Sequence, residues 1–179
     1  MAVLVALLRG INVGGNKRVP MAELVSLAKA IGCATATTYI QSGNLIVTTK
    51  HSPPDLEVEL ERALQKKFGF EVVTIVRTAK EWRSYAEGSP FPDAEKERPQ
   101  LLHLGLTKGS AKAGATEMLE GYAKAGERVH VGRNFLWVDF LGGAGSSKIT
   151  PNVLDRALGS TVTMRNWKSV LAIAAMLPK

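Results

Sequence analysis

The sequence predicts an α+β protein of two subdomains, the first a ferredoxin-like βαββαβ plait and the second a related α+β unit with an extra C-terminal helix. Over residues 1–88, apolar β-branched runs and helical patterns follow one another in the order strand, helix, strand, strand, helix, strand. The same order returns over residues 101–179 without a repeat of the sequence. Residues 89–100 are rich in Pro and charged residues, which predicts a linker between the two.

In the first subdomain, each element has a local signal. Residues 3–8 form an apolar run, and Pro20 opens a segment with apolar side chains at helical spacing that ends at Gly32. Residues 35–40 and 45–49 are β-branched runs on either side of a polar turn, which predicts a hairpin.

The second helix of this subdomain has the clearest start. Ser52 stands three residues before Asp55, as in a capping box. Acidic residues lead this helix and basic residues end it, as the helix dipole favours. Residues 71–77 are predicted to form the fourth strand, and Thr78 with Glu81 marks the start of a further short helix.

In the second subdomain, the predicted elements follow in the same order. They are strands at 101–107, 128–131, 135–141 and 161–164, and helices at 112–124, 150–158 and 166–176. The runs at 3–8 and 135–140 are apolar on both strand faces, which predicts that both faces of each sheet are covered.

The composition is that of a soluble globular protein, with 45% hydrophobic and 22% charged residues. No apolar run reaches the roughly 18 residues of a membrane span, so we expect no membrane partner. Cys33 is the single cysteine and the three histidines are scattered, so the sequence predicts no disulfide, as fits a cytoplasmic protein, and no metal site. Cys33 is interpreted as a small residue at the edge of the core.

The net charge of +7 is spread along the chain. Residues 1–88 carry 11 Lys and Arg against 8 Asp and Glu, and residues 89–179 carry 12 against 8. A basic surface favours anionic partners, nucleic acid among them. The alternative is that this surface only keeps the protein soluble.

Two Gly- and Asn-rich segments, Leu7–Lys17 and Thr38–Asn44, each adjoin a predicted strand. In a βαββαβ plait both segments open at the same edge of the sheet, and so does the end of the second helix with Lys66 and Lys67. Backbone N–H groups of the glycines and a helix N-terminus at Pro20 favour an anion at this edge. Arg9 supplies a bidentate fork for the same ligand.

The spacing of Gly10 and Gly15 is similar to that of a phosphate-binding P-loop. Lys17, however, stands one position late, and no Ser or Thr follows it to hold magnesium. The glycines also lack the spacing of a dinucleotide-binding loop. The alternative is that the glycines make a tight turn while the amide side chains of the two segments hydrogen-bond the backbone.

Two further loops are candidates. Residues 142–148 lie between a strand and a helix, where they either cradle a phosphate or serve as a flexible linker with capping serines. Arg165 and Asn166 stand at the start of the last helix, where the dipole does not favour a cation. Arg165 therefore binds a ligand or pairs with a carboxylate such as Asp139, the one carboxylate expected to be partly buried.

The predicted ligand-binding residues are Arg9, Asn12, Gly14, Gly15, Lys17, Gln41, Ser42, Asn44, Lys148, Arg165 and Asn166. No catalytic residue is assigned, because no Ser-His-Asp order or nucleophile elbow is present.

Residues Leu7–Met21 and Thr38–Asn44, with Ser147–Thr150 and Arg165–Trp167, resemble motifs of the bacterial family catalogued as domain of unknown function 1697. The resemblance extends over nearly the whole chain. It implies a bacterial, cytoplasmic protein with two α+β subdomains, the first ferredoxin-like, and it implies no cofactor and no defined activity.

The interpretation we favour is a module that binds a small anionic ligand, a nucleotide or a phosphorylated metabolite, at the loop edge of the first subdomain. RNA is the weaker case, because residues 45–47 lack the stacking aromatic side chains of an RNA-binding plait. The alternatives are an enzyme acting on a small anionic substrate and a protein-interaction or assembly module. The oligomeric state stays open.

Overall fold

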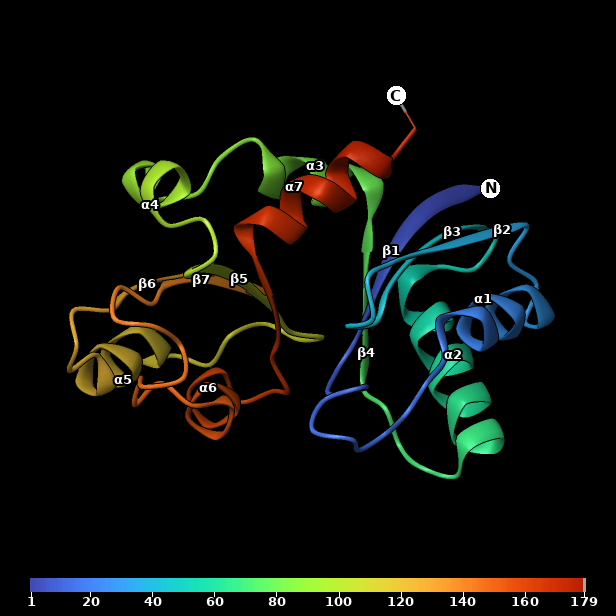
Figure 1. Ribbon diagram of the computed structural model, residues 1–179, viewed down its shortest axis with the longest axis horizontal. Helices are drawn as coiled ribbons and strands as arrows, with labels where there is room; N and C mark the ends of the chain where they lie inside the picture. The colour runs from blue at the N-terminus through green and yellow to red at the C-terminus, as the bar shows by residue number, and fades with distance from the viewer. Residues whose placement is uncertain (179) are drawn as a thin grey trace. The chain divides into compact units, whose positions relative to one another are not determined.

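The structure, a computed structural model, describes residues 1–178. The chain divides into two compact units, Met1–Arg83 with the chain from Ile173 onward, and Ser84–Ala172. Each unit contains a four-stranded antiparallel sheet with helices packed against it, which confirms the predicted fold class (Figure 1). Residues 89–100, expected from the sequence to be a linker, contain the helix Pro92–Glu97 and lie within the second unit.

The first unit has the elements β1 (Ala2–Leu8), α1 (Met21–Ala30), β2 (Thr35–Tyr39), β3 (Asn44–Thr49), α2 (Pro53–Phe68) and β4 (Thr74–Thr78). α3 (Ala79–Ala86) follows directly. The strands lie in the order β2-β3-β1-β4, and every neighbouring pair is antiparallel. This is the ferredoxin-like plait that the sequence predicts.

The second unit has the elements α4 (Pro92–Glu97), β5 (Leu102–Leu106), α5 (Ala115–Tyr122), β6 (Arg128–Val131), β7 (Phe135–Asp139), α6 (Pro151–Leu158) and β8 (Thr163–Asn166), and α7 (Trp167–Met176) follows β8. Its strand order, β6-β7-β5-β8, corresponds strand by strand to that of the first sheet. The second half of the chain therefore has the same βαββαβ topology, as its order of elements predicts.

Local capping decides where several helices start. Ser52 accepts a hydrogen bond from the Asp55 N–H at the start of α2. At α3, the Glu81 N–H donates to Thr78 Oγ1 and the Thr78 N–H donates to the Glu81 carboxylate, which is the reciprocal pattern of a capping box. Both predicted starts are confirmed.

Two predicted boundaries are wrong for tertiary reasons. β4 begins at Thr74 and not at residue 71, because its partner β1 ends at Leu8, which pairs with Thr74. α5 begins at Ala115 and not at Lys112, since the Lys112 N–H donates to the Leu158 carbonyl at the end of α6. Neither partner can be read from the local sequence.

Both faces of β1 are buried, as its apolar sequence predicts. Leu4, Ala6 and Leu8 belong to a core with side chains of α1 and α2, and Val5 and Leu7 on the opposite face are also buried. In Figure 1, α1 and α2 lie on one face of the first sheet, and α5 and α6 on one face of the second. The second core joins residues of β7, α5 and α6.

His103 on β5 gives the fold a dependence on pH. Burial lowers the pKa of His103, although Nδ1 lies 3.0 Å from the Leu101 carbonyl oxygen, which acts in the opposite direction. The ring also meets Phe140 edge-on at 5.3 Å between centroids. The unfolded chain, with a pKa of about 6.5 at this residue, binds more protons than the folded chain at lower pH.

We therefore expect the free energy of unfolding to fall as the pH decreases below about 6.5. Urea unfolding of the wild type and of His103→Gln at pH 7.5 and 5.5 measures this dependence. The variant should lose less of its stability between the two pH values. An equal loss in both proteins would show that His103 does not carry the effect.

Candidate functional site

Three segments of the first unit meet at one end of its sheet: residues 9–20, residues 40–44 and residues 66–73, together called the loop edge. The Leu8 N–H donates to the Gly43 carbonyl at 2.8 Å, and the Arg9 N–H donates to the Val73 carbonyl at 2.9 Å. The convergence of these segments that the plait topology predicts is thus present.

Asn12 joins two of these segments through its side-chain amide. Its Nδ2 donates to the carbonyls of Val19 and Gln41 at 2.9 and 2.8 Å, and its Oδ1 accepts from the Val19 N–H at 2.9 Å. The backbone of Asn12 has a positive φ of 56°, a conformation that Asn tolerates better than most residues. The Asn12 amide therefore hydrogen-bonds the backbone of two segments. This role is the alternative to ligand binding that the sequence left open.

Asn44 has a similar role beneath the hairpin. The residue is fully buried, and its Nδ2 donates to the Tyr39 carbonyl and to Ser42 Oγ, both at 3.0 Å. Gln41, by contrast, is exposed at the surface. Of the predicted amide ligands, Gln41 is the one whose side chain faces solvent.

Gly14 and Gly15 form the tip of the first segment. The Asn16 N–H donates to the Val13 carbonyl, and both central glycines have positive φ, 58° and 79°, as a type I′ turn requires. A Cβ on either residue would meet nothing within 4 Å. The backbone conformation and not crowding accounts for these glycines, and the turn projects into solvent.

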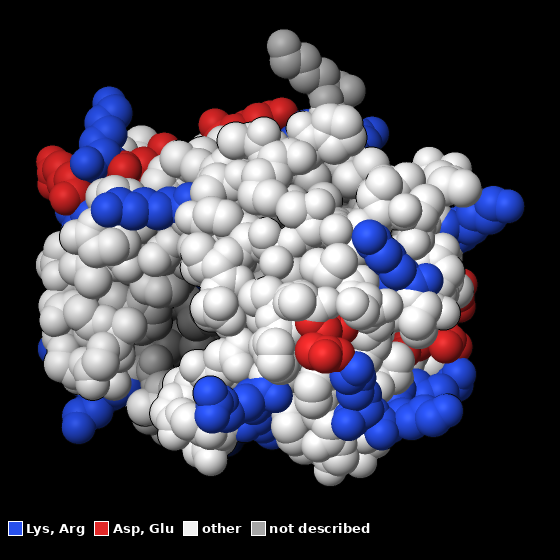
Figure 2. All heavy atoms as spheres, turned by 45° about the vertical axis from the view of Figure 1, so that its right-hand side comes forward, with Lys and Arg blue, Asp and Glu red and all other residues white. Residues whose placement is uncertain are grey.

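The basic residues of the loop edge differ in their partners. Lys17 Nζ donates to the Glu71 carbonyl at 2.6 Å, and Lys67 forms an ion pair with Glu23 on α1. The exposed side chains of Arg18 and Lys66 have no hydrogen-bond or ion-pair partner within residues 1–178. Figure 2 shows Lys and Arg side chains gathered toward the lower edge of the face in view, the end at which the 10–19 loop and the end of α2 lie in Figure 1.

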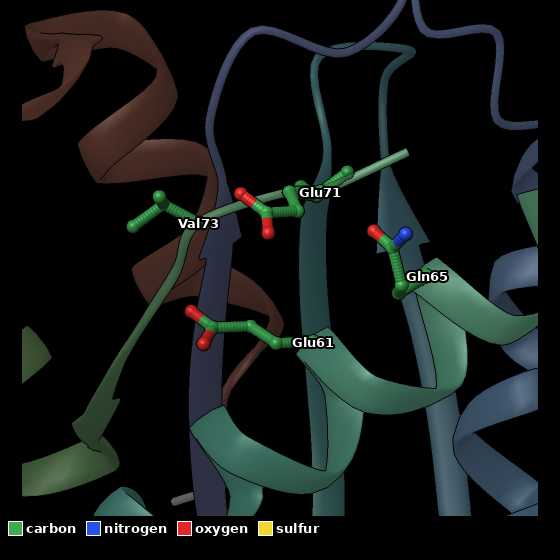
Figure 3. A pocket seen from close by; sticks show the side chains of 5 residues that line it. Glu61, Gln65, Glu71 and Val73 are labelled. Carbon is green, nitrogen blue, oxygen red and sulfur yellow. The ribbon is translucent and has the colours of Figure 1, made fainter. Parts of the chain in front are cut away.

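A pocket of about 320 Å³ adjoins the loop edge between α2 and the segment that leads into β4. Figure 3 shows Glu61 and Gln65 projecting from α2 and Glu71 from the opposite segment, with both carboxylates directed toward the pocket. Glu61 Oε1 accepts from the Thr74 N–H at 2.7 Å. The sequence did not single out these acids, because Glu61 stands among the charged residues of α2 and Glu71 in the segment predicted as the start of the fourth strand.

Lys148, Arg165 and Asn166 belong to the second unit. The exposed Lys148 follows a turn in which Ser146 Oγ donates to the Gly142 and Gly143 carbonyls. Asn166 Oδ1 accepts from the Ser169 N–H at 2.9 Å in the first turn of α7. The predicted ligand residues therefore fall into two groups, one on each unit.

A match to a family model covers residues 1–137, and the family is described as protein of unknown function (DUF1697). The chain belongs to this family. The matched range contains the whole loop edge of the first unit and ends before Lys148, Arg165 and Asn166. The resemblance inferred from the sequence motifs is thereby confirmed.

Among solved structures, this DUF1697 protein is similar to the conserved bacterial protein SP0830 from Streptococcus pneumoniae. The two share 22% sequence identity with a TM-score of 0.77, and the alignment covers 99% of each chain. At this identity the likeness shows a common fold. No curated protein matches the chain.

Arg165 of this DUF1697 protein does not pair with Asp139, which was one of its two predicted roles. Asp139 is fully buried and accepts hydrogen bonds from Arg98 and Arg128, with Nε–O distances of 3.0 Å for each. Arg165 Nη1 donates to the Met164 carbonyl at 2.7 Å, and burial lowers the pKa of Arg165 to about 10. Arg98 and Arg128 lie 41 and 11 residues from Asp139, so the sequence offered no local signal for the pairing.

Residues 1–178 contain no cluster with the chemistry of a metal site. No group of three or more His, Cys, Asp or Glu side chains in this range could hold a metal ion. Cys33 is buried, and burial raises the pKa of its thiol although a hydrogen bond with Thr49 acts against this. No helix in the described chain is long and apolar enough to cross a membrane.

Proposed function

We propose that this DUF1697 protein binds a small anionic ligand, a nucleotide or a phosphorylated metabolite, at the loop edge of its first unit. The observation that carries the proposal is that the exposed Gly14–Gly15 turn and the exposed side chains of Lys17 and Arg18 directly precede the start of α1. Short spacing along the chain keeps these groups near one another.

The start of α1 supports an anion at this place. Pro20 is its N-cap residue, and no side chain caps the helix. The first N–H groups of a helix lack intrahelical partners and carry partial positive charge. An oxygen of a phosphate group can accept from them, as at other helix N-termini.

The charged neighbours favour a ligand on the outer surface of the loop edge. Arg18 offers a planar fork that suits phosphate oxygens, and Lys66 adds a second cation. Glu61 and Glu71 line the adjoining pocket, and their carboxylates disfavour an anion inside it. Glu23 in the first turn of α1 is paired with Lys67, so its charge is offset.

Arg18→Ala should weaken binding of pyrophosphate, AMP or ribose 5-phosphate by about 10- to 100-fold, since a hydrogen bond to a charged group contributes about 1.5–3 kcal/mol. Titration calorimetry at low salt measures the affinity. The matched control is Lys29→Ala, which removes an exposed cation from the last turn of α1. The control should bind like the wild type, and both variants should unfold like it.

The proposal fails if none of these anions binds the wild type, or if the two variants lose affinity equally. Binding should weaken as salt is raised, because exposed charges are screened. Following the bound compound for conversion in the same samples separates binding alone from catalysis.

A further inference from the structure

A pocket of about 320 Å³ in the second unit is lined mainly by rings. Phe135 and Trp137 of β7 lie on the strand face opposite α5 and α6, since the intervening Leu136 and Val138 belong to the core with those helices. His130 of β6 pairs with Trp137 in the register. The remaining wall is formed by Ser84, Tyr85, Gly88 and Pro90.

The rings of this pocket are held in place by contacts within the unit. Tyr85 lies 5.4 Å from Phe135 between ring centroids, and Trp167 lies 5.6 Å from Trp137 in an edge-on arrangement. Trp137 is 3% exposed, whereas Phe135 is half-buried. Such fixed rings form a preorganised surface, which lowers the entropic cost of binding.

Gly132 shows that the position of the Phe135 ring depends on a missing side chain. A Cβ on Gly132 would lie 2.3 Å from Cε1 and Cζ of Phe135. The Gly132 N–H also donates to the Phe135 carbonyl at 2.8 Å, which closes the turn between β6 and β7. The ring therefore folds back over the turn, and any larger residue at Gly132 would displace it.

The lining favours an uncharged ligand. It contains no Lys, Arg, Asp or Glu, so an ion placed in the pocket would lose hydration without gaining an ion-pair partner. His130 is an exposed lining residue, and its ring nitrogens make no hydrogen bond within residues 1–178. They can donate to, or accept from, a polar edge of the ligand.

We propose that this pocket binds a neutral planar heteroaromatic ring of the size of a nucleobase. The rings of Tyr85, Phe135 and Trp137 provide offset or edge-on contacts to such a ring, and His130 meets its polar edge. The volume lies at the lower end of the roughly 300–1,000 Å³ of ligand pockets, which suits one ring system. This site is separate from the proposed anion site and does not depend on it.

Adenine, uracil and indole are the planar probes, and cyclohexanol is a non-planar control of similar apolar character. Each probe is titrated into the full chain, and binding is measured by calorimetry and by saturation-transfer NMR. We expect binding of at least one planar probe and no binding of cyclohexanol. Phe135→Leu should weaken that binding roughly two- to tenfold, because it keeps an apolar side chain but removes the ring. Phe91→Leu, a half-buried Phe of the same unit outside the pocket, should leave it unchanged.

His130→Ala alters an exposed position and should fold normally, so it tests the pocket even if Phe135→Leu is unstable. It should weaken a nucleobase more than indole, which has fewer polar ring atoms. Failure of every planar probe to bind, equal binding of cyclohexanol, or unchanged affinity in His130→Ala would overturn the proposal. Arg18→Ala should leave binding of the planar probe unchanged, which keeps this result distinct from that of the anion site.

Discussion

Asp139→Ala is expected to destabilise the second unit by about 3–5 kcal/mol, the usual cost of removing one partner from a buried ion pair. Asp139 is fully buried and accepts from both Arg98 and Arg128. Its removal leaves the guanidinium of Arg98, 14% exposed, without its buried acceptor. Burial raises the pKa of Asp139, but the two arginines more than offset this and hold its pKa below its ordinary value.

Urea unfolding at pH 7 measures the loss. The matched control is Asp93→Ala, because Asp93 Oδ2 accepts from the same two arginines at 2.7 Å but is a surface residue. The hydrogen bonds from Arg128 and Arg98 lower the pKa of Asp93 to about 2. Exposed pairs contribute little, so this control should change stability only slightly. If Asp139→Ala lowered the free energy of unfolding no more than Asp93→Ala does, the burial of Asp139 would not account for the destabilisation.

The second large effect is expected for Gly43→Ala, which should destabilise the first unit by about 2–4 kcal/mol. Gly43 has a φ of 77°, in the left-handed region that disfavours a side chain. A Cβ there would lie 2.8 Å from both Ile11 Cδ1 and Leu8 Cβ. The Leu8 contact cannot be relieved by a rotamer change, because Cβ is fixed to the backbone of β1.

Gly14→Ala separates the two causes of this effect. Gly14 also has a positive φ, 58°, but a Cβ there would meet nothing within 4 Å. Urea unfolding should therefore show a smaller loss, about 1–2 kcal/mol from the backbone conformation alone. If Gly43→Ala and Gly14→Ala were equally stable, the close approach of the hairpin to Leu8 and Ile11 would not contribute to the loss of stability.

The candidate site divides into parts that the sequence could and could not predict. The meeting of the two Gly- and Asn-rich segments followed from strand directions in a plait, and the hydrogen bond from Asn12 to the Gln41 carbonyl is consistent with it. The acids of the neighbouring pocket were missed, since Glu61 and Glu71 are unremarkable in a charged helix and loop. Their shared direction depends on how α2 lies against β4.

The sequence also predicts only part of the aromatic pocket of the second unit. Alternation along a strand places Phe135 and Trp137 on one face of β7. That Tyr85, 50 positions earlier in the numbering, contributes a ring to the same pocket depends on the path of the chain after α3. The position of the Phe135 ring over Gly132 is likewise a result of packing.

By itself the sequence determined the order of strands and helices, the capping of α2 and α3, a first plait with a related second unit, and the family. These features rest on local causes: side-chain periodicity, capping hydrogen bonds and turn preferences act over a few residues. The tertiary structure alone decided that Asp139 pairs with Arg98 and Arg128, that Asn44 is buried under its hairpin, and where the pockets lie. Those contacts join residues far apart in the chain, so they depend on strand register and helix packing.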